Sequence, residues 1–318
     1  MRPDTGLSVV VLGGTGFLGR HIHAAFAARG ARVHPVSRTA PLCLDLLTTP
    51  PDELANLVEQ TGADVVVNAA GRAWRSNEKE MAAGNAELVE RLIAALSGNP
   101  IRLVQLGSVH EYGAGAQDAA TSEDHEPAPV TPYGRTKLQA TQAVLHATSE
   151  RNVDGVVLRL ANVIGPGVPE GSLFGRVAAD LAEAARAGKA AELRLPPLRA
   201  ARDLVDVGDA VTSVIAAATA PSHAVTGRVI NVGRGEAVPM RDLIHRMVAL
   251  SGLEIPIVED AEGPPSRTDV AWQCLDIARA ERLLGWRPRR TLDDSLRDLL
   301  AHVLPAEHPP LGVTTNTH

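Results

Sequence analysis

Tyr133 and Lys137 are the residues of this chain whose types and spacing most directly suggest chemistry. Four positions apart, they would lie one turn apart on the same face of a helix. A neighbouring ammonium stabilises a phenolate, so Lys137 is expected to lower the pKa of Tyr133 toward the range useful for proton transfer. Such a pair is common by chance on surface helices. Here it follows Ser108 by 25 residues and also follows a glycine-rich turn, which makes the combination specific.

The glycine-rich turn contains Gly13, Gly16 and Gly19 and follows an apolar run at residues 9–12. The run is typical of a fully buried parallel strand, and the periodic stretch at 20–29 predicts a helix. Glycines at this spacing permit a tight turn, close approach of the backbone to a pyrophosphate, and close helix–strand packing. The N–H groups and the dipole of the helix then favour the phosphate charge. An ordinary glycine-rich loop is the alternative, which the flanking strand and helix disfavour.

The end of the next predicted strand indicates which dinucleotide would bind. An NAD site usually offers a carboxylate to the ribose 2′-hydroxyl, whereas an NADP site uses an arginine. No acidic residue occurs between Asp4 and Asp45, and Ser37 and Arg38 stand where the carboxylate is expected. Arg38 could pair with a 2′-phosphate and Ser37 could add a hydrogen bond. Arg38 could instead be a solvated loop residue, but the missing carboxylate favours NADP(H).

Strands and helices that could position these residues alternate along the first half of the chain. Strands are predicted at 9–12, 32–36, 64–68, 103–106 and 156–159, and helices at 19–29, 52–60, 85–97 and 133–150. This alternation predicts right-handed βαβ units, and so an α/β fold with a doubly wound parallel sheet of the Rossmann type. The long polar loop at 113–132 is expected to be a lid or a binding loop.

Taken together, the sequence resembles the extended short-chain dehydrogenase/reductase family, in its nucleotide-sugar branch of epimerases, dehydratases and ketoreductases. The resemblance covers residues 9 to about 303. The matching segments are Gly13-Gly14-Thr15-Gly16-Phe17-Leu18-Gly19, Asn68-Ala69-Ala70-Gly71, Gly107-Ser108-Val109-His110-Glu111-Tyr112-Gly113, Tyr133-Gly134-Arg135-Thr136-Lys137, the stretch 158–167, Arg202-Asp203-Leu204-Val205-Asp206-Val207, Ile230-Asn231-Val232-Gly233 and Leu284-Gly285-Trp286-Arg287-Pro288.

The resemblance implies a role for each matching residue. Ser108 would hydrogen-bond the reacting oxygen, Tyr133 would exchange a proton with it, and Lys137 would hold the nicotinamide ribose. The expected cofactor-binding residues are Gly13, Thr15, Gly16, Phe17, Leu18, Ser37, Arg38, Asp45, Leu46, Ala69, Ala70 and Gly71, together with Tyr133 and Lys137. The expected substrate-binding residues are Trp74, His110, Asn162 and Arg202, and Glu111 is a further candidate for the pocket lining.

The resemblance also implies a division of the chain. Residues 1–165 would form the NADP-binding Rossmann domain, to which the chain returns near 203–233. Residues 166–318 would mainly form a smaller α/β substrate-binding domain with a helix at 173–187 and a frayed tail at 305–318. Two copies would pair through the helices at 85–97 and 133–150 as a homodimer. Val89, Leu92, Ile93 and Leu96 form an apolar stripe on the first of these helices, which could pack on the partner or on the protein's own sheet.

Departures from the family patterns narrow the reaction. Dehydratases of the family have Asp-Glu directly after the catalytic Ser or Thr, whereas Val109 and His110 follow Ser108. Neither Cys43 nor Cys274 matches the acid–base cysteine of the GDP-fucose-synthase-like enzymes. NADPH-dependent reduction of the C4 carbonyl of an NDP-4-keto-6-deoxyhexose, with dTDP as the expected nucleotide, remains the preferred interpretation. A 4-epimerase with bound NAD is the first alternative. A non-catalytic NADP-binding sensor is the second, although the intact Ser108, Tyr133 and Lys137 set argues against it.

Composition excludes several other classes of protein. The net charge is −6 and no long basic tract occurs, which argues against a nucleic-acid partner. The 2 cysteines lie far apart without histidines at ligand spacing, so neither a disulfide framework nor a metal site is expected. No targeting segment and no membrane-length apolar run is recognised, and a cytoplasmic protein is expected.

Overall fold

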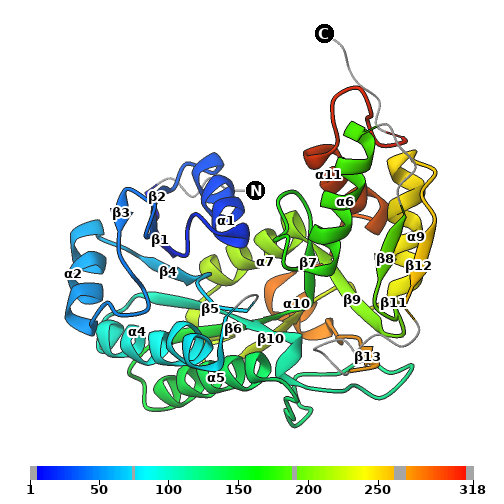
Figure 1. Cartoon of the computed structure of the whole chain (residues 1–318). Helices are drawn as coiled ribbons and strands as arrows, with labels where there is room; N and C mark the ends of the chain where they lie inside the picture. The colour runs from blue at the N-terminus through cyan, green and yellow to red at the C-terminus, as the bar shows by residue number, and fades with distance from the viewer. Residues whose placement is uncertain (1–5, 74–75, 188–191, 261–269, 313–318) are drawn as a thin grey trace.

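The computed structural model describes residues 6–73, 76–187, 192–260 and 270–312 of the chain. A seven-stranded sheet with the order β10-β6-β5-β4-β1-β2-β3 forms its centre (Figure 1). All neighbouring strands are parallel. The strands are β1 (Ser8–Leu12), β2 (Arg32–Ser37), β3 (Leu42–Cys43), β4 (Val65–Asn68), β5 (Arg102–Ser108), β6 (Asp154–Leu160) and β10 (Val229–Val232). The predicted doubly wound α/β fold is confirmed.

Helices cover both faces of this sheet, which explains why its central strands are apolar almost throughout. Alternate residues of β1 face opposite cores: Val9 and Val11 pack with helices α1 and α7, whereas Val10 and Leu12 pack with α2, α4 and α5. These helices are α1 (Phe17–Ala28), α2 (Pro51–Thr61), α4 (Leu88–Leu96), α5 (Pro132–Ser149) and α7 (Val207–Thr219). α3 (Glu78–Met81) and the π-helical turn η1 (Ala82–Glu87) precede α4.

The chain reverses direction along the sheet between β1 and β4. In open α/β sheets, ligands bind beyond the carboxyl ends of the strands at such a switch point. The glycine-rich turn follows β1, the segment Ala69–Gly71 follows β4, and Ser108 is the last residue of the adjacent β5. The topology therefore gathers these segments at one edge of the sheet.

The second half of the chain builds a smaller layer beside the main sheet. β9 (Ala201–Asp206) is its centre and pairs with β7 (Asn162–Ile164), β11 (Ala237–Pro239) and β13 (Trp272–Gln273). A separate core lies between α6 (Leu173–Ala187), α9 (Met240–Ser251) and α11 (Leu292–Val303), on the right of Figure 1. β8 (Leu193–Leu195) and β12 (Ile257–Glu259) form a two-stranded sheet, and α8 (Ser222–Val225) and α10 (Ala278–Leu284) complete the elements.

The two layers interleave along the chain. β7 already belongs to the smaller sheet, although it precedes residue 165, and β9 belongs there as well. The chain then returns to the main layer with α7, which packs against α1, and with β10, which pairs with β6. The main layer is therefore built from segments on both sides of residue 165.

Two segments without regular secondary structure are held by contacts to distant parts of the chain. In the tail at 305–318, expected to be frayed, Pro310 is buried and the Leu311 N–H donates to the Leu250 carbonyl over 2.8 Å, whereas residues 313–318 lie outside the described residues. The loop at 113–132, expected to be a lid or a binding loop, is held at its middle, because the Glu123 carboxylate accepts the Asn231 N–H over 2.8 Å and also faces Arg279. Both segments are held by hydrogen bonds to distant residues, which a short sequence pattern does not reveal.

The apolar stripe on the helix predicted at 85–97, which could pack on a partner or on the protein's own sheet, packs inside the chain. Val89 and Leu96 are fully buried and Leu92 is 1% exposed, in a core shared with β1, β4 and β5. Only Ile93 of the four remains partly exposed. The stripe therefore gives no independent support for a dimer. Within the described residues, no helix has both the length and the apolar character needed to cross a membrane.

Candidate active site

Ser108 and Tyr133 meet at the carboxyl edge of the main sheet. Ser108 ends β5, where its hydroxyl oxygen accepts the His110 N–H over 3.3 Å. Helix α5 begins at Pro132, and the Thr131 hydroxyl caps it by accepting the Gly134 N–H over 3.0 Å. The cap fixes the first turn of α5, and the Ser108 hydroxyl lies near enough to the Tyr133 hydroxyl to act on its pKa. The sequence prediction that these two residues act together therefore has the geometry it requires.

Lys137 lies one turn further along α5 and is buried. Its ammonium donates to the carbonyl oxygen of Leu106, two residues before Ser108 on β5. Burial lowers the pKa of Lys137 to about 8, and the charge of Glu111 opposes that effect. The helix thus brings Tyr133 and Lys137 to the last residues of β5, the strand that ends with Ser108.

The expectation that Lys137 lowers the pKa of Tyr133 is wrong for the protein chain by itself. Burial of the phenolic end raises the pKa of Tyr133 to about 12, the Ser108 hydroxyl acts in the opposite direction, and Glu111 raises it further. The structure favours the phenol, which is the form that can donate a proton, over the phenolate. The physical reason is that the spacing of two residues on a helix does not show whether they are buried. Here burial of the phenol has the largest effect on its pKa.

Three of the expected substrate-binding residues come together beside Tyr133. The rings of His110 and Tyr133 meet edge to face, with centroids 5.7 Å apart. The Asn162 side chain and the charge of Arg202 both act on the pKa of His110. Burial and this charge lower the pKa of His110 to about 4, so the imidazole is neutral near pH 7. Trp74, the fourth expected residue, lies outside the described residues.

The glycine-rich turn has a backbone that side chains would not fit. Gly13 has a φ of +74°, and a Cβ there would lie 2.8 Å from the Ala70 backbone. A Cβ at Gly19 would lie 2.0 Å from the Gly13 carbonyl oxygen. Phe17 and Leu18 open helix α1, so free N–H groups of its first turn point toward the same edge of the sheet. This cradle fits the pyrophosphate of a dinucleotide.

A group of hydroxyls at the end of β2 adjoins this turn. The Thr15 hydroxyl donates to that of Ser37 over 2.8 Å and lies 3.2 Å from that of Thr39. Arg38 is exposed, and in the described parts of the chain its guanidinium has no hydrogen-bond or ion-pair partner. The set fits a ribose 2′-phosphate. The sequence analysis missed Thr39, although a hydroxyl residue directly after Arg38 was visible in it.

Asn85 is a second residue that the sequence analysis missed. Its amide oxygen accepts the Arg72 N–H over 2.8 Å, and its amide nitrogen donates to the Arg72 carbonyl over 2.9 Å and to the Thr136 hydroxyl over 2.9 Å. Asn85 therefore ties the segment after β4 to the helix that carries Tyr133. The only signal in the sequence is an asparagine inside an otherwise helical stretch, where the residue is unfavourable unless its side chain is used.

The remaining expected cofactor residues line the same end of β4 and β3. Ala69 and Ala70 follow β4, where the Asn68 amide oxygen accepts the Ala70 N–H over 3.2 Å. Leu46 packs in the same small core as Ala70. The exposed Asp45 carboxylate accepts the Leu47 N–H over 3.1 Å and so shapes the turn that leads there.

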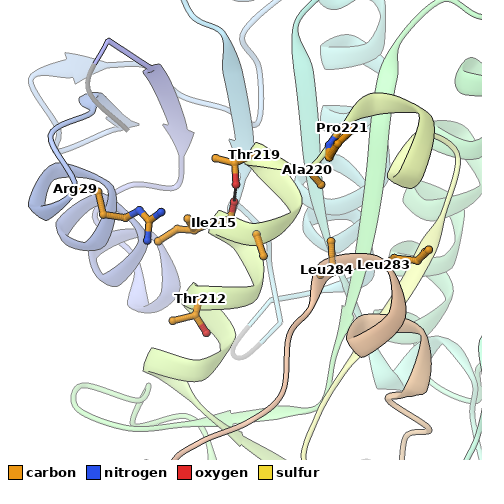
Figure 2. Close-up of a pocket in the computed structure, with 9 residues that line it drawn as sticks. Arg29, Thr212, Ile215, Thr219, Ala220, Pro221, Leu283 and Leu284 are labelled. Carbon is orange, nitrogen blue, oxygen red and sulfur yellow. Dashed lines mark hydrogen bonds between the residues drawn. The ribbon is translucent and has the colours of Figure 1, made fainter. Parts of the chain in front are cut away.

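A hollow of about 360 Å³ lies elsewhere, between the ends of α1, α7 and α10 (Figure 2). Arg29, Ile215 and Leu284 line it, and none of the expected site residues does. Among the described residues, no three His, Cys, Asp or Glu side chains gather as a metal site requires. The expected site residues instead converge at the edge of the main sheet, where hydroxyls, an ammonium and the glycine-rich turn come together.

Similarity to known proteins extends over most of the chain. Residues 9–233 match the model of the NAD dependent epimerase/dehydratase family. The chain is 43% identical over 305 residues to the dTDP-6-deoxy-L-talose 4-dehydrogenase (NAD(P)(+)) of Kitasatospora kifunensis, covering 92% of this chain and 94% of that one. It is 29% identical to the GDP-6-deoxy-D-mannose reductase of Pseudomonas aeruginosa, covering 92% and 95%.

A solved structure extends the similarity to the whole fold. RMD from Pseudomonas aeruginosa, complexed with NADPH, superposes with a TM-score of 0.81 at 26% sequence identity, covering 94% of this chain and 98% of that chain. The motifs that suggested the resemblance thus lie in a fold that known members share. This chain belongs to the NAD dependent epimerase/dehydratase family.

Proposed function

We propose that the protein is an NADPH-dependent reductase that converts the C4 carbonyl of an NDP-4-keto-6-deoxyhexose into an alcohol, with dTDP as the nucleotide. The observation that carries this proposal is the Ser108–Tyr133 hydroxyl pair beside buried Lys137. The Kitasatospora kifunensis relative, a 4-dehydrogenase named for a dTDP-6-deoxy sugar, supports it. Oxidation of a C4 alcohol and reduction of a C4 ketone are the two directions of one reaction and use the same residues.

Each residue has a defined part in this reaction. Ser108 and Tyr133 would hold the carbonyl oxygen, and Tyr133, as a phenol, would give it a proton. Lys137 would supply positive charge next to the developing phenolate and hold the ribose of the cofactor. The cofactor, when bound in the cradle of Gly13 and Gly16, supplies the hydride. The part of the site that receives the sugar nucleotide would be lined by Asn162, Arg202 and neutral His110.

The same geometry argues against dehydration. Val109 is buried and apolar, and His110 is neutral near pH 7, so neither supplies the carboxyl groups that elimination of water needs. Glu111 is close by, but both its carboxylate oxygens have partners inside the protein, at Ser108 and Arg159. Reduction needs from the protein only the hydroxyls and the ammonium that are present, and the cofactor would supply the hydride.

An isotope experiment tests the reaction. With NADPH deuterated at C4, deuterium is expected at C4 of the product sugar, and no ketone should form from an NDP-hexose. The measurement is mass spectrometry and NMR of the product with a panel of nucleotide-linked 4-keto sugars. Interconversion of NDP-hexose epimers by the purified protein without added cofactor would contradict the proposal and indicate a 4-epimerase. Cofactor binding without any turnover would indicate a sensor.

Cofactor preference is expected to depend on Arg38. In the unchanged protein, NADPH should bind more than about tenfold more tightly than NADH, because a charge-assisted pair contributes about 1.5–3 kcal/mol. Arg38→Asp should narrow or reverse that preference, and Arg32→Asp, an exposed change at the start of the same strand, should not. Fluorescence titration with both cofactors measures the ratio. Equal affinities in the unchanged protein would contradict the NADP assignment.

We also propose a homodimer in which α4 and α5 face the same two helices of a second copy. Ile93 and Ala143 line a shallow groove between these helices, so some apolar surface remains for a partner. Light scattering of the purified protein at micromolar concentration should give twice the 33.4 kDa of one chain. The mass of a single chain would contradict the dimer.

A further inference from the structure

Glu111 is a carboxylate buried beneath the catalytic residues, and the reaction proposed above gives it no part. It belongs to the turn η2 (Val109–Glu111) that follows β5, and its side chain is 0% exposed. One carboxylate oxygen, Oε1, accepts the Ser108 N–H over 2.8 Å. The other, Oε2, accepts Nε–H of Arg159 over 2.7 Å, and Arg159 is itself 3% exposed. A buried ion pair therefore lies directly behind Ser108.

Gly107 explains how the carboxylate comes so close to the strand. A Cβ at this position would lie 2.6 Å from Oε1 of Glu111 and 3.2 Å from the Val157 side chain. Leu106, the residue before it, supplies the carbonyl oxygen that accepts the Lys137 ammonium. The carboxylate and the ammonium thus bind β5 two residues apart, at the Ser108 N–H and at the Leu106 carbonyl. In the interior, where the effective dielectric constant is low, charges this close influence each other strongly.

The charges around this pair come from several elements. Glu111 raises the pKa of Lys137 against the effect of burial, and it also raises the pKa of Tyr133. Arg159, from β6, faces Glu111 and lies over the Tyr112 ring, and Glu123 faces Tyr112 from the loop before α5. Burial raises the pKa of Glu111, while the charge of Arg159 and the Ser108 N–H oppose that rise. Among the described residues, Glu111 is the acidic group that acts on Lys137.

We propose that Glu111 is a positioning residue of the active site, which holds the backbone of Ser108 and supplies the counter-charge that keeps Lys137 cationic. Arg159 anchors the carboxylate, and Gly107 leaves the space for it. The catalytic consequence rests on the proposed reduction, in which Lys137 acts as an ammonium. The charge relationship between Glu111 and Lys137 does not rest on it and can be measured without turnover.

The chain makes this measurement simple, because it contains three lysines: Lys79, Lys137 and Lys189. In protein with Lys79→Arg and Lys189→Arg, ¹³C-labelled at the lysine ε-carbon, one NMR signal reports Lys137. Glu111→Gln in this background is expected to lower the pKa of Lys137 by about one unit, the lower end of the effect of a nearby opposite charge. An unchanged titration in folded protein overturns the proposal.

Glu123→Gln is the matched control. Its carboxylate is also buried, accepts the Asn231 N–H over 2.8 Å and faces Arg279 at 3.4 Å, but it acts on Tyr112 and not on Lys137. It should leave the Lys137 titration unchanged. An equal shift in both variants would overturn a specific role for Glu111. The fold of each variant is checked by circular dichroism and thermal melting.

A second variant covers the case in which Glu111→Gln does not fold, since it leaves the buried Arg159 without its partner. Glu111→Gln with Arg159→Met removes both charges and should also lower the pKa of Lys137.

In the reductase assay, loss of kcat/KM at alkaline pH should begin at lower pH in the folded variant. If kcat/KM begins to fall at the same alkaline pH in the variant and in the parent protein, the catalytic part of the proposal is wrong. If the parent protein reduces no 4-keto sugar, the proposed function fails, and the lysine titration still decides the role of Glu111.

Discussion

Tyr133→Phe is expected to reduce turnover of the 4-keto sugar nucleotide by about 10²–10⁴, while NADPH binding and the fold remain intact. The phenol hydroxyl is the proton donor in the proposed reaction, and the Ser108 hydroxyl beside it acts on its pKa. Phenylalanine keeps the ring that packs edge to face against His110 but cannot donate. Steady-state assays of NADPH oxidation, with cofactor affinity measured separately by fluorescence, separate the loss of chemistry from a loss of binding.

The protein offers a matched control, because its 2 tyrosines are Tyr112 and Tyr133. Tyr112 is also buried, but its hydroxyl donates to the Asn231 side chain over 2.8 Å and not to Ser108. Tyr112→Phe should lower stability slightly, by about 1 kcal/mol for one lost hydrogen bond, and leave turnover close to that of the parent. Near-normal turnover in Tyr133→Phe would show that another group delivers the proton.

Asp203→Ala is expected to lower the free energy of unfolding by about 3 kcal/mol or more. The carboxylate is fully buried and accepts three backbone N–H groups: Arg234 over 2.8 Å, Gly235 over 3.1 Å and Leu275 over 3.1 Å. Alanine leaves all three donors without that acceptor in the interior, and each buried unpaired group costs about 1–3 kcal/mol. Chemical denaturation followed by circular dichroism measures the loss.

Two further variants show whether the lost acceptor is the cause. Asp203→Asn keeps one carbonyl oxygen at the site, so it should cost less than Asp203→Ala. Asp124→Ala removes a carboxylate whose side chain is 82% exposed and which pairs with Arg279, and it should cost less than about 1 kcal/mol. If Asp203→Ala were as stable as the parent protein, the N–H groups of Arg234, Gly235 and Leu275 would have other acceptors in the variant.

Local patterns in the sequence were sufficient for the main layer and for the relative placement of the residues proposed to be catalytic. A parallel strand buried on both faces must be apolar throughout, so Val9–Leu12 and the strands beside it stand out in the sequence. Gly13 and Gly19 are required by backbone contacts that no side chain allows, so their spacing is informative by itself. Tyr133 and Lys137 share a helix, and their relative position follows from its period alone.

The tertiary structure decided what depends on partners far apart in the chain. Asn85 joins the segment after β4 to α5 through Thr136, 51 residues away. Glu111, in the turn after β5, binds Arg159 of the neighbouring strand β6. The apolar stripe of Val89, Leu92 and Leu96 was visible in the sequence, but only the fold shows that the protein's own sheet covers it. The pKa of Tyr133 depends on burial and on Glu111 more than on its neighbour in the helix. The sequence therefore determined which groups are present and how each lies on its own element, whereas packing determined their environment, because desolvation and charge act through space and not along the chain.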